Sequence, residues 1–179
     1  HLVSGDNYLV INPCAVAKTR NWRNWTAEGY AEVADYAAEH LGMNVVLTGG
    51  PSPVETEMAS TITALCSHKP ENLVGRTSLP ELAAMLSIAH VVIAPDTGPA
   101  HIASAVGTPI IGLYAATNPE RAGPYRYSDL VVNKYPQALD KYYGLTVEAA
   151  PWGKRIQNDE CMQLIKPADV IEKLAQLVR

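Results

Sequence analysis

Short apolar runs rich in β-branched residues alternate along this chain with stretches whose apolar residues recur at helical spacing. Four runs, 8–11, 44–47, 91–93 and 110–113, have the composition of strands buried on both faces. Two weaker runs follow the same rhythm, at 72–74 and 130–132. Successive strands with a helix between them form a parallel sheet, because each connection must cross over the sheet. The alternation therefore predicts an α/β fold, a parallel sheet with helices on both faces.

Capping signals indicate where several helices begin and end. Residues 52–55 and 78–81 both fit a capping box, in which Ser and Glu satisfy each other's backbone amides. Thr26 fits an N-cap, whereas Gly42 and Gly107 fit helix C-termini. Pro99 is expected as the first residue of the helix that follows the predicted strand 91–93 and its turn. The spacing predicts core-facing residues in two helices, namely Met58, Ile62 and Leu65 in one and Ile102, Ala103 and Val106 in the other.

Composition excludes several classes of protein. A length of 179 residues fits one domain, 1–179, and 47% hydrophobic with 18% charged residues indicates a packed core. A net charge of −4 gives no electrostatic basis for nucleic-acid binding. No apolar run approaches the length of a membrane span, and no signal-peptide pattern opens the sequence. The three cysteines are far apart, which favours a reduced compartment and gives no metal-binding spacing.

Residues 95–101 read Pro-Asp-Thr-Gly-Pro-Ala-His and lead from a predicted strand into a helix. The first amides of a helix lack partners and carry partial positive charge. Gly98 lets a ligand approach them and the Thr97 hydroxyl adds a donor, so the turn predicts a phosphate site. Asp96 suits sugar hydroxyls, and His101 is expected over the same mouth. The same residues also fit a capped turn, with Asp96 or Thr97 as N-cap and His101 only packing.

Four loops follow the carboxyl ends of predicted strands, at 12–25, 48–55, 75–78 and 95–101. Ligands of open parallel sheets bind beyond these ends, so the loops are expected to converge on one site. They bring a basic cluster, an acidic side chain and a hydroxyl to it: Lys18, Arg20, Arg23, Glu55 and Thr77. Each also has a plainer interpretation, since the basic loop could be solvated, Glu55 could serve only its capping box, and Thr77 could only precede a cap.

Together these motifs resemble glycosyltransferase family 9, the ADP-heptose:lipopolysaccharide heptosyltransferases. The strongest match is 96–101, continuing through 105–109. The other matching segments are 23–25, 47–51 with Glu55, 75–79, 123–125, and Cys161 ahead of 165–167. The resemblance implies the carboxyl-terminal, Rossmann-like half of a GT-B enzyme, which holds the nucleotide-sugar donor. It also implies inverting, metal-independent transfer of heptose onto a lipopolysaccharide inner-core acceptor, without cofactor. The expected location is the cytoplasm, peripheral to the inner membrane of a Gram-negative bacterium.

Site roles follow from the resemblance residue by residue. It implies phosphate contacts for Thr19, Arg23, Thr97 and Gly98, nucleoside contacts for Glu55 and Thr77, and sugar contacts for Asp96 and His101. Family members usually carry Lys at the position of Arg23, and the segment 138–160 departs most from the family pattern. The family's general base is a carboxylate of the amino-terminal half, so no catalytic residue and no metal ligand is expected in this chain. The acceptor is expected to bind through that other half.

Two alternatives stay open at this point. One is another GT-B enzyme that uses a different nucleotide sugar, such as a UDP-sugar transferase or epimerase. The other is a non-catalytic nucleotide-binding module of similar fold. A dinucleotide dehydrogenase is disfavoured, because no Gly-x-Gly-x-x-Gly motif follows the first predicted strand.

Overall fold

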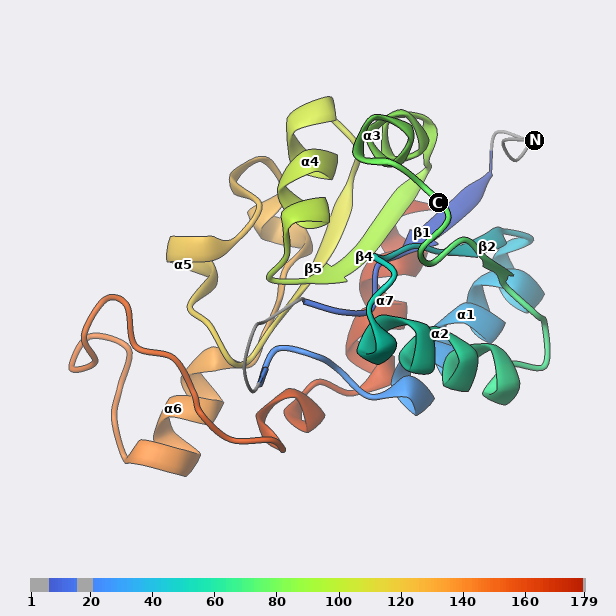
Figure 1. Ribbon diagram of the computed structural model, residues 1–179. Helices are drawn as coiled ribbons and strands as arrows, with labels where there is room; N and C mark the ends of the chain where they lie inside the picture. The colour runs from blue at the N-terminus through green and yellow to red at the C-terminus, as the bar shows by residue number, and fades with distance from the viewer. Residues whose placement is uncertain (1–6, 16–20, 179) are drawn as a thin grey trace.

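The computed structural model describes residues 7–15 and 21–178 (Figure 1). Strands and helices alternate, as the sequence predicts. The strands are β1 (Tyr8–Ile11), β2 (Asn44–Leu47), β3 (Glu71–Asn72), β4 (Val91–Pro95), β5 (Ile110–Tyr114) and β6 (Val132–Asn133). The helices are α1 (Ala27–Leu41), α2 (Pro53–Leu65), α3 (Leu79–Ile88), α4 (Gly98–Val106), α5 (Pro119–Ala122), α6 (Tyr135–Tyr143) and α7 (Pro167–Leu177), with 3-10 turns η1 (Tyr125–Leu130) and η2 (Cys161–Leu164).

All six strands are parallel and lie in the order β3-β2-β1-β4-β5-β6. The chain builds outward from β1 through β2 to β3, then returns across the sheet and builds the other way from β4. This reversal between β1 and β4 is the switch point of a Rossmann-like sheet, where the two neighbouring connections leave in opposite directions. Register there pairs Ile11 with Ile93, so both strands end at the same level.

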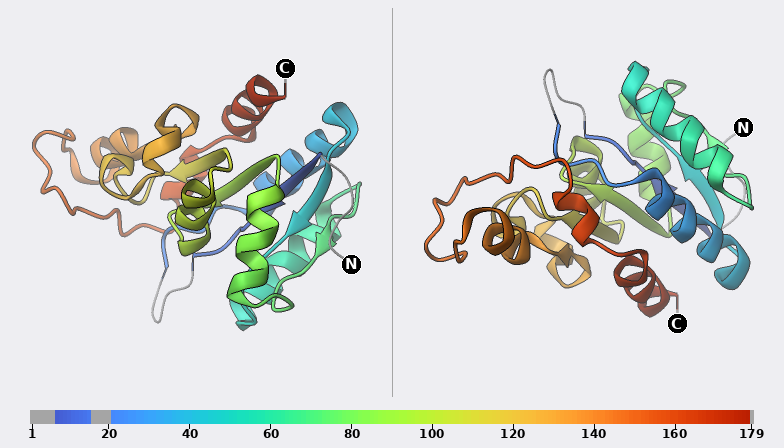
Figure 2. Two further views of the ribbon diagram at one scale, coloured as in Figure 1. Left: turned by 90° about the horizontal axis from the view of Figure 1, so that it is seen from above. Right: turned by 90° about the horizontal axis from the view of Figure 1, so that it is seen from below.

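Each face of the sheet carries its own core, which explains the unbroken apolar runs. Leu9, Ile11 and Ile93 pack with α1, α6 and α7 on one side. Val10 and Val92 pack with α3 and α4 on the other. Figure 2 shows α3 and α4 covering the sheet when it is seen from above, and α1, α6 and α7 when it is seen from below. The predicted parallel sheet with helices on both faces is therefore confirmed.

Helix ends follow the capping signals. Thr26 accepts a hydrogen bond from the Gly29 amide, and Gly42 ends α1 in the left-handed conformation at φ 62°. The reciprocal capping box forms at Ser78, with Glu81. The box predicted at Ser52 is only half formed. The Ser52 side chain accepts from the Glu55 amide, but the Glu55 carboxylate bonds to the Gly50 amide and the Ser52 hydroxyl instead of the Ser52 amide.

Two predicted strands were misplaced by one or two residues. β3 begins at Glu71, because at this sheet edge backbone pairing with Val46 and Leu47 is enough and apolar side chains are not needed. β6 begins after Leu130, because the Val131 amide bonds to the Ser128 carbonyl and closes η1 first. Both edge strands are two residues long, so the sheet is built mainly on its four inner strands.

Three details of the predicted helices were also wrong. Leu65 is 48% exposed in the last turn of α2, where it lines a surface groove. Val106 is 42% exposed at the end of α4. The buried face of α4 consists of Ala100 and Ala103, whose small side chains let the helix lie close to the sheet. Pro99 is the second helical residue, since α4 starts at Gly98.

The described part of the chain contains no helix that is both long and apolar enough to cross a bilayer. Its three cysteines are free thiols, each buried. Trp25 anchors the start of α1 to the C-terminal region, because its indole Nε1 donates to the Ile165 carbonyl at 3.1 Å. The loop between β1 and α1 is therefore held in place at Trp25, where it joins α1.

Candidate functional site

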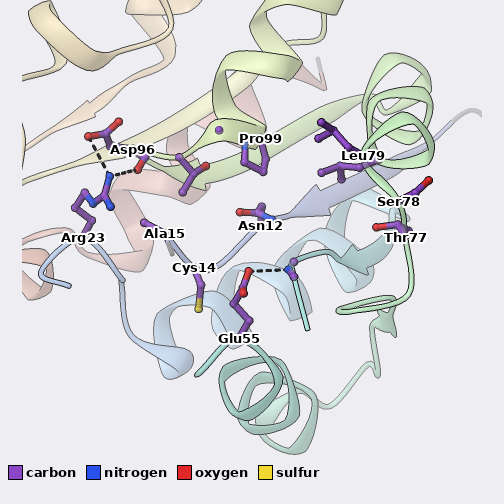
Figure 3. Close-up of a pocket in the computed structure, with 15 residues that line it drawn as sticks. Asn12, Cys14, Ala15, Arg23, Glu55, Thr77, Ser78, Leu79, Asp96 and Pro99 are labelled. Atoms are coloured by element: carbon purple, nitrogen blue, oxygen red, sulfur yellow. Dashed lines mark hydrogen bonds and ion pairs between the residues drawn. The ribbon is translucent and has the colours of Figure 1, made fainter. Parts of the chain in front are cut away.

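A pocket of about 360 Å³ opens at the carboxyl ends of β1 and β4, at the switch point (Figure 3). This volume lies in the range of small-molecule sites. All four loops predicted to converge contribute to it. Its lining residues are Asn12, Cys14, Ala15, Arg23, Gly49, Gly50, Glu55, Thr77, Ser78, Leu79, Leu82, Asp96, Thr97, Gly98 and Pro99.

The amino terminus of α4 forms one wall. Thr97 is the N-cap, and its hydroxyl oxygen accepts from the Ala100 amide at 3.3 Å. Because Pro99 has no amide hydrogen, the Gly98 amide is the one that this first turn can still offer to a ligand. A Cβ built on Gly98 meets nothing within 4 Å, so the side of the main chain where a side chain would stand is open to a ligand. The Thr97 hydroxyl hydrogen also stays available to donate.

Glu55 forms the opposite side and is buried, with 4% of its surface exposed. Its Oε1 accepts from the Gly50 amide at 2.7 Å, and its Oε2 accepts from the Ser52 hydroxyl at 2.6 Å. The carboxylate lies over the Gly49-Gly50 turn so closely that a Cβ on Gly50 would come within 2.9 Å of Oε2. The two glycines therefore make room for a fixed carboxylate, whose remaining lone pairs are acceptors for the pocket.

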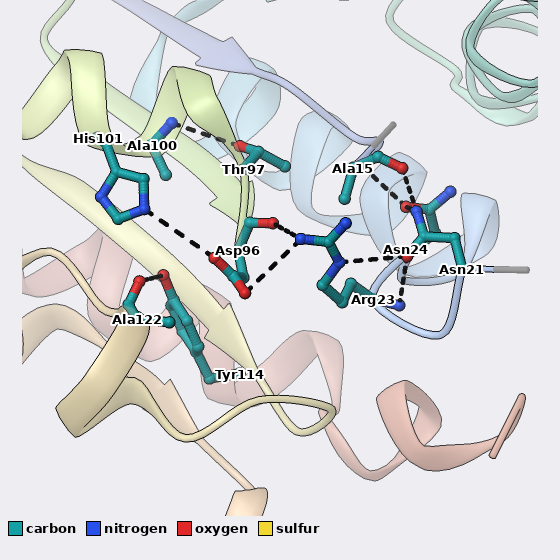
Figure 4. Close-up of polar contacts among 10 residues, drawn as sticks. All are labelled: Ala15, Asn21, Arg23, Asn24, Asp96, Thr97, Ala100, His101, Tyr114 and Ala122. Atoms are coloured by element: carbon teal, nitrogen blue, oxygen red, sulfur yellow. Dashed lines mark hydrogen bonds and ion pairs between the residues drawn. The ribbon is translucent and has the colours of Figure 1, made fainter. Parts of the chain in front are cut away.

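Arg23 reaches across to Asp96 at the end of β4 (Figure 4). Its Nη1 donates to the Asp96 backbone carbonyl at 3.0 Å and lies 3.7 Å from Asp96 Oδ2. Both side chains are mostly buried, at 24% and 14% exposed. Asn21 also fixes the position of the arginine, because its Oδ1 accepts hydrogen bonds from Arg23 Nε and from the Arg23 amide. Arg23 is thus fixed at the pocket's edge with several donors uncommitted.

The loop that carries Arg23 is tied at its base by asparagines. Asn24 Oδ1 accepts from the Ala15 amide at 2.8 Å and from Asn21 Nδ2 at 3.0 Å. Asn21 Nδ2 also donates to the Ala15 carbonyl. The three residues therefore join both ends of the loop beside the pocket. Thr19, Lys18 and Arg20 lie outside the described residues.

His101 lies beside Asp96 but does not line the pocket. Its Nε2 is 4.0 Å from Asp96 Oδ1, on the other side of that carboxylate from Arg23, and its side chain is 53% exposed (Figure 4). Tyr114 is fully buried in this cluster, where its hydroxyl donates to the Ala122 carbonyl at 2.9 Å. Burial, followed by the nearby Asp96 charge, raises the pKa of Tyr114, so the phenol stays neutral. The structure thus places Arg23 and His101 on two sides of the Asp96 carboxylate.

Another part of the pocket wall is formed by residues at the start of α3. Thr77 lines the pocket as predicted, and so do Ser78 and Leu79. Leu79 is 66% exposed, unusual for a leucine, and presents an apolar surface to the opening. Leu79 belongs to the family-like segment 75–79, but no role in the site was predicted for it from the sequence.

Asn12 and Cys14 are two further lining residues that the sequence reasoning did not assign. They directly follow β1, so their position at the end of a central strand was the available signal. Cys14 is 3% exposed, and burial together with the Glu55 charge raises the pKa of its thiol to about 12. A thiol with this pKa stays protonated at neutral pH and is not a nucleophile. Among the described residues, no group of three His, Cys, Asp or Glu side chains could hold a metal ion.

Comparison with known proteins places this geometry in a family. The family model described as glycosyltransferase family 9 (heptosyltransferase) matches residues 2–144. The lipopolysaccharide core heptosyltransferase OpsX of Haemophilus influenzae is 40% identical over 169 residues, which are 94% of this chain and 48% of that protein. The chain therefore spans about half the length of this curated relative.

Solved structures give the same result for the fold. The crystal structure of the glycosyl transferase family 9 protein from Veillonella parvula superposes with a TM-score of 0.72 at 25% identity, covering 96% of this chain and 46% of that one. The heptosyltransferase WaaC of Escherichia coli, solved with ADP, gives 0.69 at 22% identity, covering 98% of this chain and 46% of that one. The resemblance inferred from the motifs is confirmed: the chain belongs to glycosyltransferase family 9.

Proposed function

We propose that residues 1–179 form a single nucleotide-sugar-binding domain, the donor-binding half of a heptosyltransferase that takes heptose from ADP-heptose. The observation that carries this proposal is the pocket at the switch point. It combines an open helix amide at Gly98 with two oriented carboxylates, Glu55 and Asp96, on opposite sides. A nucleoside diphosphate sugar has a matching order of groups, with hydroxyls at both ends and negative charge between them.

The charges of the pocket suggest how such a donor lies. The diphosphate suits the Gly98 amide, the Thr97 hydroxyl and the uncommitted donors of Arg23. The ribose and base suit the side with Glu55 and Thr77, where a carboxylate accepts hydroxyl hydrogens and Leu79 offers apolar surface. The heptose suits Asp96, which has a free acceptor capacity beside Arg23. His101 would contact the sugar only from the rim, since it lies outside the pocket lining. Thr19, expected at the phosphates, stays a prediction.

The proposed reaction is an inverting transfer without a metal. Breaking the bond between sugar and phosphate increases negative charge on the leaving diphosphate. Arg23, the Thr97 hydroxyl and the Gly98 amide are fixed before the ligand arrives, and such preorganised donors are commonly the largest catalytic term. Loss of one donor of this kind typically costs about 3 kcal/mol in the transition state.

The remaining parts of the reaction belong to a second half. A carboxylate that deprotonates the acceptor is expected there, together with the binding site for the lipopolysaccharide core, so this chain alone should bind donor without turnover. Work on a lipid-linked acceptor fits a cytoplasmic enzyme at the inner membrane of a Gram-negative bacterium. OpsX is named for action on the lipopolysaccharide core, which supports this choice of acceptor.

Calorimetric titration of the chain tests the proposal. ADP and ADP-heptose should bind in buffer containing EDTA, with the same affinity as in buffer containing magnesium. UDP and a UDP-sugar serve as matched ligands that keep the diphosphate and change the base. Preference for the uridine nucleotides would favour another nucleotide sugar, and binding of none of the four would contradict the proposed site.

A further inference from the structure

Asn12 is a buried polar side chain with one half of its amide left unpaired. The residue is 2% exposed and lines the pocket directly after β1. Its Nδ2 donates to the Thr48 carbonyl at 3.0 Å, and its backbone amide donates to the Ile93 carbonyl at 3.0 Å. Its Oδ1 is buried and has no hydrogen-bond partner among the described residues. A buried acceptor left in this state costs about 1–3 kcal/mol, so a partner is expected.

The orientation of this amide is fixed by its surroundings. The Thr48 carbonyl can only accept, so the Asn12 atom that faces it must be the nitrogen. Backbone bonds from Asn12 to β4 and from Thr48 to the Ile11 carbonyl hold both residues at the ends of paired strands. The Oδ1 atom is therefore held in place as an acceptor that requires a donor.

The position of Asn12 limits which part of a ligand can supply that donor. Figure 3 shows its side chain between Glu55 on one side and Pro99 on the other, with Leu79 beyond it. Phosphate oxygens are acceptors and would be repelled by Oδ1. A base would lie farther out, toward Thr77 and Leu79. In the donor orientation proposed above, the ribose lies between the turn at Gly98 and the wall at Thr77 and Leu79, and its hydroxyls are donors.

We propose that Asn12 is a nucleotide-binding residue, and that its Oδ1 accepts a hydrogen bond from a ribose hydroxyl of the bound nucleoside diphosphate. This inference rests on the proposed function and adds to it. Glu55 and Asn12 then approach the ribose from two sides, each as an acceptor fixed by backbone partners. A deoxynucleotide lacking the hydroxyl that meets Asn12 leaves the buried oxygen unpaired, so the pocket selects for ribonucleotides.

Ligand-deletion calorimetry tests this pairing. ADP, 2′-deoxy-ADP and 3′-deoxy-ADP are titrated into the wild-type chain and into Asn12→Leu, which removes the acceptor at similar volume. Asn7→Leu is the matched control, because Asn7 lies just before the other end of β1 and its Nδ2 likewise donates to a backbone carbonyl, that of Leu41. Asn12→Asp keeps an acceptor and adds a charge.

The wild type should prefer ADP to one of the two deoxynucleotides by about fivefold to tenfold, the value of one hydrogen bond. This preference should fall below about twofold in Asn12→Leu, and persist in Asn7→Leu and in Asn12→Asp, although Asn12→Asp should bind all three ligands more weakly. If Asn12→Leu does not fold, Asn12→Ala gives the same comparison.

Two results would overturn the inference. One is an equal preference in wild type and Asn12→Leu, which would assign the Oδ1 partner to an ordered water and the discrimination to Glu55. The other is a wild type that binds ADP and both deoxynucleotides equally. A wild type that binds no ADP would instead contradict the proposed function, so the two failures are distinguishable.

Discussion

Replacement of Gly98 by Ala should change stability and ligand affinity in opposite directions. A Cβ built on Gly98 meets nothing within 4 Å, and its φ is not positive, so the folded chain accepts Ala without strain. Ala also restricts the unfolded chain, which typically stabilises a protein by about 0.4–1 kcal/mol. For a chain of this size that corresponds to a rise in Tm of about 1–4 °C.

The same methyl group would occupy the space that the proposed diphosphate needs. A hydrogen bond from the Gly98 amide to a charged phosphate is worth about 1.5–3 kcal/mol, so its loss should weaken ADP binding about tenfold or more. Adenosine has no phosphate, and its affinity should stay unchanged.

Thermal melts and parallel titrations with ADP and adenosine measure both effects. Gly153→Ala is the matched control, because a Cβ there also meets nothing within 4 Å and its φ is not positive, while Gly153 does not line the pocket. The control should gain stability and keep its ADP affinity. If Gly98→Ala binds ADP as tightly as wild type, the phosphates do not lie on this turn and the proposed orientation of the donor is wrong.

Two further predictions concern charge. In titrations, Asp96→Asn should bind ADP as well as wild type or better, because Arg23 loses its charged partner at 3.7 Å, but it should bind ADP-heptose more weakly. The control Asp169→Asn loses an ion pair with Lys134 and should change neither affinity. Burial raises the pKa of Cys14 to about 12 and of Cys66 and Cys161 to about 11. Because unfolded thiols ionise near 9, the free energy of unfolding should fall between pH 9 and 11 in urea melts, and less so with all three cysteines replaced by Ala.

The order of strands and helices was predictable because buried parallel strands and helix caps are local signals. The continuous apolar run of β4 and the Thr26 cap needed no tertiary information. The edge strand β3 was misplaced because its backbone pairing with β2 demands no particular side chains. Convergence of the loops was predictable too, since parallel strands place all their carboxyl ends at one edge.

Side-chain partners in the site were less predictable. Glu55 fits both a capping box and a bond to the Gly50 amide, and only the path of the turn decides between them. Asp96 and Thr97 both fit an N-cap, and the structure gives that role to Thr97. His101 was expected at the pocket mouth, but its helical position places it on the far side of Asp96. The orphaned oxygen of Asn12 depends on contacts between three strands, which no local pattern contains.

The central place of β1 has a consequence for how the pocket moves. β1 is bonded on both sides, to β2 and to β4, and Asn12 continues this ladder to Ile93. Amides in such a position exchange with solvent only when the whole domain opens, whereas those of exposed turns exchange through local fraying. The pocket therefore combines a floor that opens only with global unfolding and a wall, at the exposed residues Ser78 and Leu79, that opens locally. Ligand binding should slow hydrogen exchange in this wall first, and in the floor only as far as it stabilises the whole domain.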